Sequence, residues 1–373
     1  MGAFRFVHSS DLHLGRGFAA MPQDIRHRLT EARHGAISRL AGAARAAGAA
    51  HVLVAGDIFD SETPSDAVWR QALTAMAADP AIEWLLLPGN HDSLAAEALW
   101  ERLVRAAPPN VRALVAAEPI ELALGAVLLP APTPRRRPGR DPTEWMDEAV
   151  TPEGALRIGL AHGPVQDFGE GTERDVIAPD RAARAGLAYL ALGDWHGAVE
   201  IDRRTWYSGA PERDRFRHAG RGLCLSVALE GAGAPPVVHQ VETGIFDWRE
   251  AETPLLPGEP PTPALEAHFP PPAERRNALL KLRATGRTSL SARAALIEAA
   301  EAAAPEFGFF ALDDAALEIE VEPEDLDEID RGGALRTAAE ALRAEAETGD
   351  EEARAVARAA LSLLHTILRR EAA

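Results

Sequence analysis

Short apolar runs alternate with longer Ala- and Leu-rich segments over the first 90 residues of the chain. Apolar runs of this length predict buried strands, and the longer segments between them predict helices. We expect three strands, over 4–8, from residue 52 and over 82–87, and two helices, over 24–47 and from an N-cap at Ser65 to residue 78. This alternation of strands and helices predicts a parallel α/β arrangement.

Between residues 111 and 130 the pattern changes to short strands without helices between them, which predicts a second sheet. Further buried strands are expected over 157–161 and 187–192. Three later strands, over 206–209, 222–230 and 236–243, are expected to complete the second sheet.

Residues 252–273 contain many prolines and lack a hydrophobic period, so they predict a linker. We expect a larger domain over 1–250, a linker over 251–274 and a smaller acidic α+β domain over 275–373. The elements expected in the smaller domain are a strand over 278–285, a helix over 291–304, a hairpin over 307–311 and 316–321, and a helix over 333–346.

A last helix is expected over 350–370, and it carries one apolar stripe. The stripe consists of Val356, Ala360, Leu364 and Ile367. It either packs onto the smaller domain or docks a partner protein.

The composition is that of an ordinary globular protein with more than one domain, since the 373 residues are 46% hydrophobic and 26% charged. Cys224 is the only cysteine, which excludes a disulfide framework and a thiolate metal site and indicates a reducing compartment. The N-terminus lacks the apolar segment of a signal peptide, and no apolar run reaches the roughly 18 to 20 residues of a membrane span. We therefore expect a cytoplasmic protein.

The formal net charge of −18 at first argues against a polyanionic substrate. The charge is uneven, however, because residues 301–373 hold 19 acidic and 7 basic side chains. The rest of the chain is closer to neutral, so nucleic acid is not excluded. A Pro-rich loop over 132–142 carries four arginines that either form a solvated connection or contact a phosphate backbone: Arg135, Arg136, Arg137 and Arg140.

Polar side chains that bind metals follow five of the predicted strands where each strand ends. They are Asp11 and His13, Asp57, Asn90 and His91, His162, and Asp194 and His196. Open α/β sheets place their chemistry at these strand ends. Carboxylate, amide and imidazole together suit two adjacent divalent ions such as Mn, Fe or Zn, whereas Mg and Ca prefer oxygen alone. A carboxylate has lone pairs on both sides, so Asp57, in the middle of the set, is the natural bridge.

The ordered series D-x-H, G-D, G-N-H-D, H-G and G-D-x-H resembles the calcineurin-like metallophosphoesterases, over about residues 1–245. Two segments resemble the SbcD-type DNA repair exonucleases within that family, HSSDLHLG at 8–15 and YSGAPE at 207–212. The resemblance implies a four-layer α/β/β/α sandwich, in which two mixed sheets pack face to face between helices. A smaller C-terminal α+β cap domain follows.

The resemblance also implies roles for the site residues. One metal ion would be held by Asp11, His13, Asp57 and His196, and the other by Asp57, Asn90, His162 and Asp194. A hydroxide bridging the two ions would attack phosphorus, and His91, oriented by Asp92, would be the general acid that protonates the leaving group. The implied function is a metal-dependent DNA exonuclease or endonuclease in DNA repair.

Nucleases of this type act with an SMC-like coiled-coil ATPase, and the chain itself lacks a G-x4-G-K-[ST] phosphate-binding loop. The expected partners are therefore DNA, such an ATPase subunit and a second copy of the chain in a homodimer. Two alternatives stay open. One is a phosphodiesterase or phosphatase that acts on small molecules or phosphoproteins, and the other is a non-catalytic accessory subunit with a decayed site.

Asp194 departs from the family pattern, whose closing motif is G-H-x-H, because it occupies the place of the first of those histidines. The additional carboxylate lowers the net charge of a site that holds two divalent ions. We predict from this that the site prefers harder ions, with Mn2+ favoured over Fe and Zn.

Overall fold

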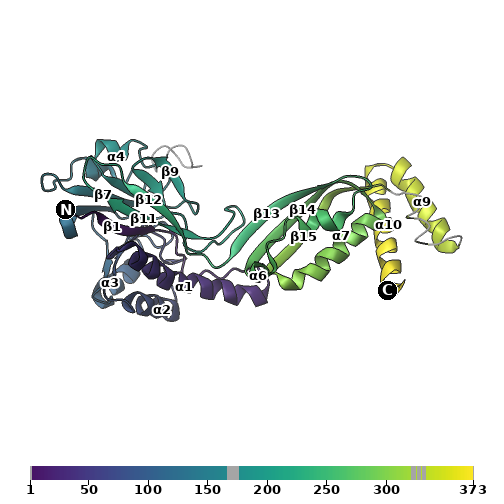
Figure 1. The fold of residues 1–373 in the computed structure, drawn as a ribbon, viewed down its shortest axis with the longest axis horizontal. Helices are drawn as coiled ribbons and strands as arrows, with labels where there is room; N and C mark the ends of the chain where they lie inside the picture. The colour runs from purple at the N-terminus through teal and green to yellow at the C-terminus, as the bar shows by residue number, and fades with distance from the viewer. Residues whose placement is uncertain (1, 166–175, 321–324, 326–328, 330–332, 373) are drawn as a thin grey trace. The chain divides into compact units, whose positions relative to one another are not determined.

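The computed structural model describes residues 2–165, 176–320, 325, 329 and 333–372 (Figure 1). The chain divides into two compact units, Met1–Asp247 and Trp248–Ala373, which we call unit 1 and unit 2. Among the described residues, no helix is both long and apolar enough to cross a membrane.

The first sheet of unit 1 has the strand order β12-β11-β1-β2-β3-β4. Strands β1 to β4 are parallel to one another, β11 is antiparallel to β1, and β12 is antiparallel to β11. The bounds of these strands are Phe4–Ser9 (β1), His51–Val54 (β2), Glu83–Leu86 (β3), Val111–Ala113 (β4), Leu223–Leu229 (β11) and Val237–Glu242 (β12).

The second sheet has the order β5-β6-β7-β8-β10-β9, with a parallel centre and an antiparallel strand at each edge. Its strands are Ile120–Glu121 (β5), Ala126–Ala131 (β6), Leu156–His162 (β7), Tyr189–Gly193 (β8), Val199–Asp202 (β9) and Thr205–Tyr207 (β10).

The two sheets pack face to face through one apolar core. Phe6 and Leu53 of the first sheet share this core with Leu128 and Ile158 of the second. The neighbours of Leu53 along β2 point the other way, because successive side chains of a strand alternate between its faces. They pack against three helices, α1 (Gln23–Ala47), α2 (Asp66–Ala77) and α3 (Glu97–Ala106).

The outer face of the second sheet is covered by two short helical segments, η2 (Glu144–Asp147) and α4 (Arg181–Arg184), through Met146 and Ala182. Helices therefore lie outside both sheets, and the predicted four-layer α/β/β/α sandwich is confirmed.

Strands β11 and β12 were expected in the second sheet, and that expectation is wrong, since both belong to the first. β11 is buried on both faces: Leu225 lies in the core between the sheets, and Cys224 lies in the core beneath the helices. A strand that is apolar on both faces fits either sheet, so its hydrophobic pattern does not select the partner.

Unit 2 contains a sheet of β13 (Asp247–Leu255), β14 (Ala278–Ser289) and β15 (Phe309–Glu320), with α7 (Leu290–Ala303) between the last two. The predicted hairpin is wrong, because residues 309–320 form one strand parallel to β14. The Asp313-Asp314 pair resembles a turn in the sequence. It lies instead at an irregularity in the ladder, where the pairing shifts opposite Arg283, and Asp314 forms an ion pair with Arg293 at 2.7 Å.

The predicted linker over 252–273 is wrong in part, because some of it forms regular structure. Residues 252–255 complete β13, and two short helices follow, α5 (Pro261–Glu266) and α6 (Pro272–Arg275). Proline occupies the first turn of both helices, where its missing N–H leaves no hydrogen bond unmade.

The last two helices are α9 (Ala334–Thr348) and α10 (Glu351–Ala372), and the buried stripe of α10 differs from the predicted one. Leu361 and Leu364 pack with Ala339 and Leu290 of unit 2. Val356 and Ile367, which were expected on that stripe, are 63% and 46% exposed. Of the two alternatives for the predicted stripe, packing onto the smaller domain holds for Leu364, whereas Val356 is exposed to solvent.

Candidate metal centre

The candidate ligands gather at the carboxyl ends of the central strands of both sheets. Asp11 and His13 follow β1, Asp57 follows β2, Asn90 and His91 follow β3, His162 ends β7, and Asp194 and His196 follow β8. Asp11, His13, Asp57, His162 and His196 are buried, and Asn90, His91 and Asp194 are half-buried.

The backbone is strained where these side chains leave the strands. Asp11, His13, Asp57 and Asp194 have φ angles of 55°, 42°, 54° and 103°, and they are four of the six non-glycine residues with positive φ in the described part of the chain. Such conformations cost about 1 to 3 kcal/mol each and cluster at functional sites. At Gly89 an added Cβ would lie 2.1 Å from Asp57 Oδ1, so glycine leaves room for that carboxylate.

Asp11, His13 and His196 form the first group of candidate ligands. The Nε2 atoms of His196 and His13 lie 3.8 and 3.9 Å from Asp11 Oδ1. Asp11 itself is fixed through its other carboxylate oxygen, which accepts hydrogen bonds from the Ser10 hydroxyl and the Asp194 N–H. One oxygen of Asp11 is therefore left to face the two imidazoles.

Asp57 lies between the first group and a second one. Its Oδ2 is 3.5 Å from His13 Nε2, and its Oδ1 is 3.5 Å from His162 Nε2. His162 Nε2 also lies 3.8 Å from Asp194 Oδ1, which accepts a hydrogen bond of 3.0 Å from the Asn90 side-chain amide. The structure thus brings together all seven predicted ligands, with Asp57 between the two groups.

Several buried atoms at this site lack a hydrogen-bond partner among the described residues: Asp11 Oδ1, His13 Nε2, Asn90 Oδ1 and His162 Nε2. Buried polar atoms are nearly always satisfied in folded proteins, so a cluster of them needs an explanation. Cations bound between them would satisfy all four at once. The mixture of nitrogen and oxygen donors fits divalent ions of the Mn, Fe or Zn type.

Each candidate histidine has a partner at its Nδ1 atom, which leaves Nε2 directed at the site. His162 Nδ1 forms a hydrogen bond of 2.8 Å with the Ala55 carbonyl oxygen, and His196 Nδ1 forms one of 3.0 Å with Asp214 Oδ1. His13 Nδ1 lies 3.1 Å from Asp60 Oδ1, at ion-pair distance. Carbonyl and carboxylate partners of this kind fix the tautomer and ring orientation of metal-binding histidines.

The charges at the site attract a cation. Burial raises the pKa of Asp57 well above its ordinary value and also raises that of Asp194. Burial opposes a charged His162 as well, but Asp57, Asp11 and Asp194 outweigh it and raise the pKa of His162 to about 9. These carboxylates draw protons when no cation balances them, and a bound metal ion would displace those protons.

His91 lies beside the bridging carboxylate. Its backbone N–H donates to Asp57 Oδ1 at 2.9 Å, and its ring Nδ1 lies 3.2 Å from the Asp60 carbonyl oxygen. The prediction that Asp92 orients His91 is wrong, because the buried Asp92 carboxylate accepts hydrogen bonds from the Gly89 and Phe59 N–H groups. Asp92 therefore fixes the loop that carries Asn90 and His91.

The sequence reasoning missed Asp60 and Asp214, the carboxylates that contact His13 and His196. Asp60 follows Asp57 by three residues, and Asp214 lies in the segment after β10. Both are acidic residues in loops, and nothing in their spacing distinguishes them from solvated ones.

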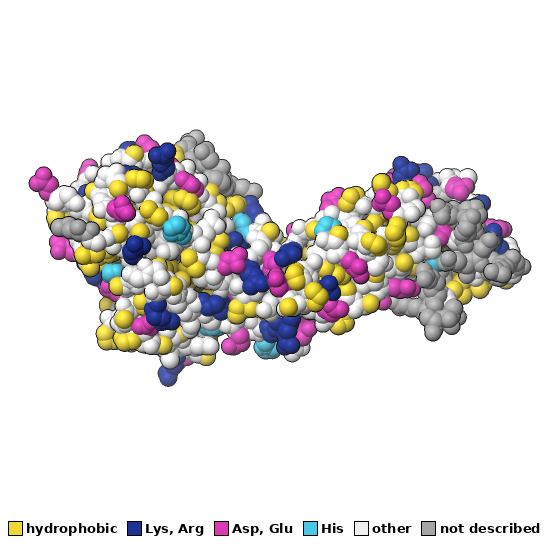
Figure 2. Space-filling view, in the orientation of Figure 1, with side chains coloured by type: hydrophobic (Ala, Val, Ile, Leu, Met, Phe, Trp, Pro, Cys, Tyr) yellow, Lys and Arg dark blue, Asp and Glu magenta, His cyan; other side chains and the backbone are white. Residues whose placement is uncertain are grey.

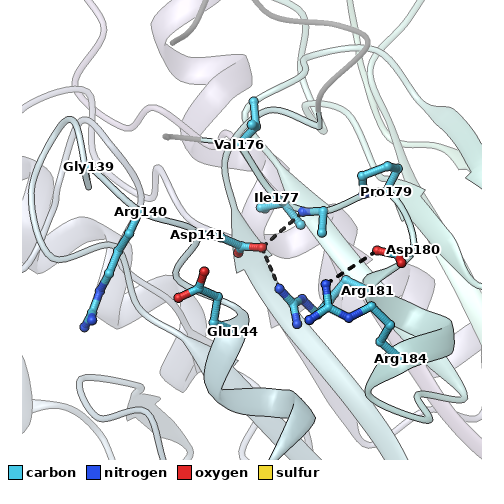
Figure 3. Close-up of a pocket in the computed structure, with 11 residues that line it drawn as sticks. Gly139, Arg140, Asp141, Glu144, Val176, Ile177, Pro179, Asp180, Arg181 and Arg184 are labelled. Carbon is cyan, nitrogen blue, oxygen red and sulfur yellow. Dashed lines mark hydrogen bonds and ion pairs between the residues drawn. The ribbon is translucent and has the colours of Figure 1, made fainter. Parts of the chain in front are cut away.

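The four arginines of the 132–142 loop lie at the surface, and no contact among the described residues joins them to a candidate ligand. Arg140 lies at a separate cavity of about 580 Å3, where Asp141 accepts hydrogen bonds from Ala178 N–H and Arg181 (Figure 3). None of the candidate metal ligands is among the residues that line this cavity.

A face-to-face α/β sandwich with histidines and carboxylates gathered around one aspartate is an arrangement that could hold metal ions for hydrolysis. The chain belongs to the calcineurin-like phosphoesterase family, because residues 4–198, more than half of its length, match that family. The protein is therefore a metal-dependent phosphoesterase.

Solved structures similar to this chain show only low sequence identity and low TM-scores. One similar structure is that of TT1561 from Thermus thermophilus, at 10% identity and a TM-score of 0.41, covering 65% of this chain and 99% of that one. A second is 11% identical with a TM-score of 0.37, covering 64% of this chain and 99% of the other. No curated protein matches the chain. The family match names no subfamily, so the SbcD-type assignment stays a prediction.

Proposed function

We propose that the protein is a nuclease that hydrolyses phosphodiester bonds of DNA with two divalent metal ions, Mn2+ above all. The observation that supports a site for two ions is the position of Asp57, whose two carboxylate oxygens each lie 3.5 Å from a different histidine. Asp11, His13 and His196 would hold the first ion, Asn90, His162 and Asp194 the second, and Asp57 both.

Ions bound there would bind the phosphoryl oxygens and activate the attacking water. The remaining steps belong to side chains of the protein. His91, whose ring is held at the Asp60 carbonyl, would donate a proton to the leaving oxygen. A positioned general acid of this kind contributes roughly 10² to 10⁴ in rate.

DNA is favoured as the substrate by the SbcD-type segments of the sequence and by the surface arginines of the 132–142 loop. These arginines would contact the phosphate backbone and position the duplex without reading its sequence. On the face seen in Figure 2, Lys and Arg side chains are interspersed with Asp and Glu side chains. We propose an SMC-like ATPase and a second copy of the chain as protein partners.

An Mn2+-dependent assay on linear duplex DNA, circular single-stranded DNA and a small phosphodiester tests the substrate class. We expect cleavage of DNA, with a substrate affinity that falls steeply as salt rises, because contacts to phosphates release counterions. Cleavage of the circle would indicate endonuclease action. Hydrolysis of the small ester with no cleavage of either DNA would contradict the proposal and favour a small-molecule phosphodiesterase or phosphatase.

A further inference from the structure

Arg16 joins the two carboxylates that contact histidines of the first ligand group. Its Nη1 atom lies 3.2 Å from Asp60 Oδ1 and 3.3 Å from Asp214 Oδ2. Asp60 in turn contacts Nδ1 of His13, and Asp214 contacts Nδ1 of His196. One guanidinium nitrogen thus connects the supports of both imidazoles.

The backbone holds Arg16 at this place. Leu14 and Phe59 form an isolated parallel bridge, and the Asp60 N–H donates to the Leu14 carbonyl at 3.1 Å. The Arg16 N–H closes a turn onto the His13 carbonyl at 3.2 Å. The paired backbone segments therefore place Arg16 beside Asp60.

Two carboxylates at one site repel each other, and Asp60, whose side chain is 30% exposed, could turn toward solvent instead of toward His13. The Arg16 side chain is only 27% exposed, so its charge is partly shielded from water and from salt. A cation between the two carboxylates removes the repulsion and fixes both of them as acceptors for an Nδ1 proton. Each imidazole then presents the Nε2 lone pair to Asp11 and to a bound cation.

We propose that Arg16 is a positioning residue for the first ligand group, acting on His13 and His196 through Asp60 and Asp214. The inference rests on the proposed metal centre. The effect of Arg16 should be confined to the first ligand group, because the histidine of the second group is held differently, with His162 Nδ1 at the Ala55 carbonyl oxygen. Loss of Arg16 should therefore weaken one metal site and leave the other unchanged.

The test is a calorimetric titration of the metal-free protein with Mn2+. Wild type should bind two ions. Arg16→Gln should bind one of them several-fold more weakly, up to the roughly 10- to 100-fold that loss of a direct partner of a ligand costs, and the other with unchanged affinity. Arg16→Lys should recover most of the loss, because a single nitrogen makes both contacts. Arg16→Met is the second neutral variant if the Gln variant does not fold.

Arg215→Gln is the matched control, because Arg215 contacts Asp214 at 3.1 Å through two nitrogens and forms no ion pair with Asp60. It should change Mn2+ affinity less than Arg16→Gln. Equal affinities in wild type and Arg16→Gln, or equal weakening of both sites, would overturn the role of Arg16 alone. A wild-type protein that binds no Mn2+ would instead overturn the metal centre and this inference with it.

Discussion

The side-chain amide of Asn90 donates a hydrogen bond of 3.0 Å to Asp194 Oδ1. This contact places the carboxylate that departs from the family pattern inside the second ligand group, 3.8 Å from His162 Nε2. It also turns the other end of the amide, Asn90 Oδ1, toward the site without a partner among the described residues. Asp194 therefore belongs to the centre by position, and the centre carries one more negative charge than a histidine would give it.

Exchanging Asp194 for histidine should change the metal preference. We expect wild type to be activated best by Mn2+ and Asp194→His to shift toward Zn2+, because an imidazole replaces a hard oxygen donor and removes one negative charge. Activation series with Mn2+, Fe2+ and Zn2+ at fixed pH measure this. An unchanged order of metals in Asp194→His would contradict the charge argument.

His91→Ala should keep its metals and lose turnover. The ring does not hold Asp57, which accepts a hydrogen bond from the His91 backbone N–H instead. We expect unchanged Mn2+ stoichiometry and a fall in kcat of roughly 10² to 10⁴. Elemental analysis and steady-state kinetics on a diester with a poor leaving group give the two readouts. Normal cleavage by this variant would rule out His91 as the acid.

Replacing Arg135, Arg136 and Arg137 together with Gln should weaken DNA binding and reduce its salt dependence. Each lost phosphate contact makes the negative slope of log K against log salt less steep by about 0.9. Hydrolysis of a small diester should be unaffected, since these side chains do not contact the candidate ligands. A triple variant at three other exposed arginines of unit 1, Arg70, Arg105 and Arg112, is the control. Equal effects of both triple variants would argue against a specific role for the loop.

Cys224 should be unreactive in the folded protein. It is fully buried on β11 beneath the helices of unit 1, and burial raises the pKa of its thiol to about 12. Only the thiolate reacts with disulfide reagents, so we expect no labelling at pH 8 under native conditions and one thiol per chain in denaturant. Rapid labelling of the native protein would contradict the burial of Cys224 on β11.

The ligand set could be predicted from the sequence because its members follow apolar strands, and the carboxyl ends of parallel strands meet at one edge. Contacts between loops that are far apart in the sequence could not be predicted in this way. Asp60, Asp214 and Arg16 come together only when β1, β2 and the segment after β10 are in place, and each alone resembles a solvated charge. The same holds for Asp92, whose backbone partners depend on the conformation of the loop.

The errors in the fold have the same origin. β11 is apolar on both faces, so its place beside β1 is decided by packing of the whole sandwich. In unit 2 the Asp313-Asp314 pair is a turn signal by local propensity, and the parallel ladder with β14 overrides it. The stripe of α10 was misjudged because Ala and Leu occur on several of its faces, and only contact with α9 and α7 selects one.

The central claim is that Asp57 is shared by two metal ions, and Mn2+ stoichiometry in wild type, Asp57→Asn and Asp194→Asn tests it most directly. We expect two ions per chain in wild type, close to none in Asp57→Asn, and one retained with wild-type affinity in Asp194→Asn. If the Asp57→Asn variant still binds one ion with wild-type affinity, the claim that both ions share the Asp57 carboxylate is contradicted.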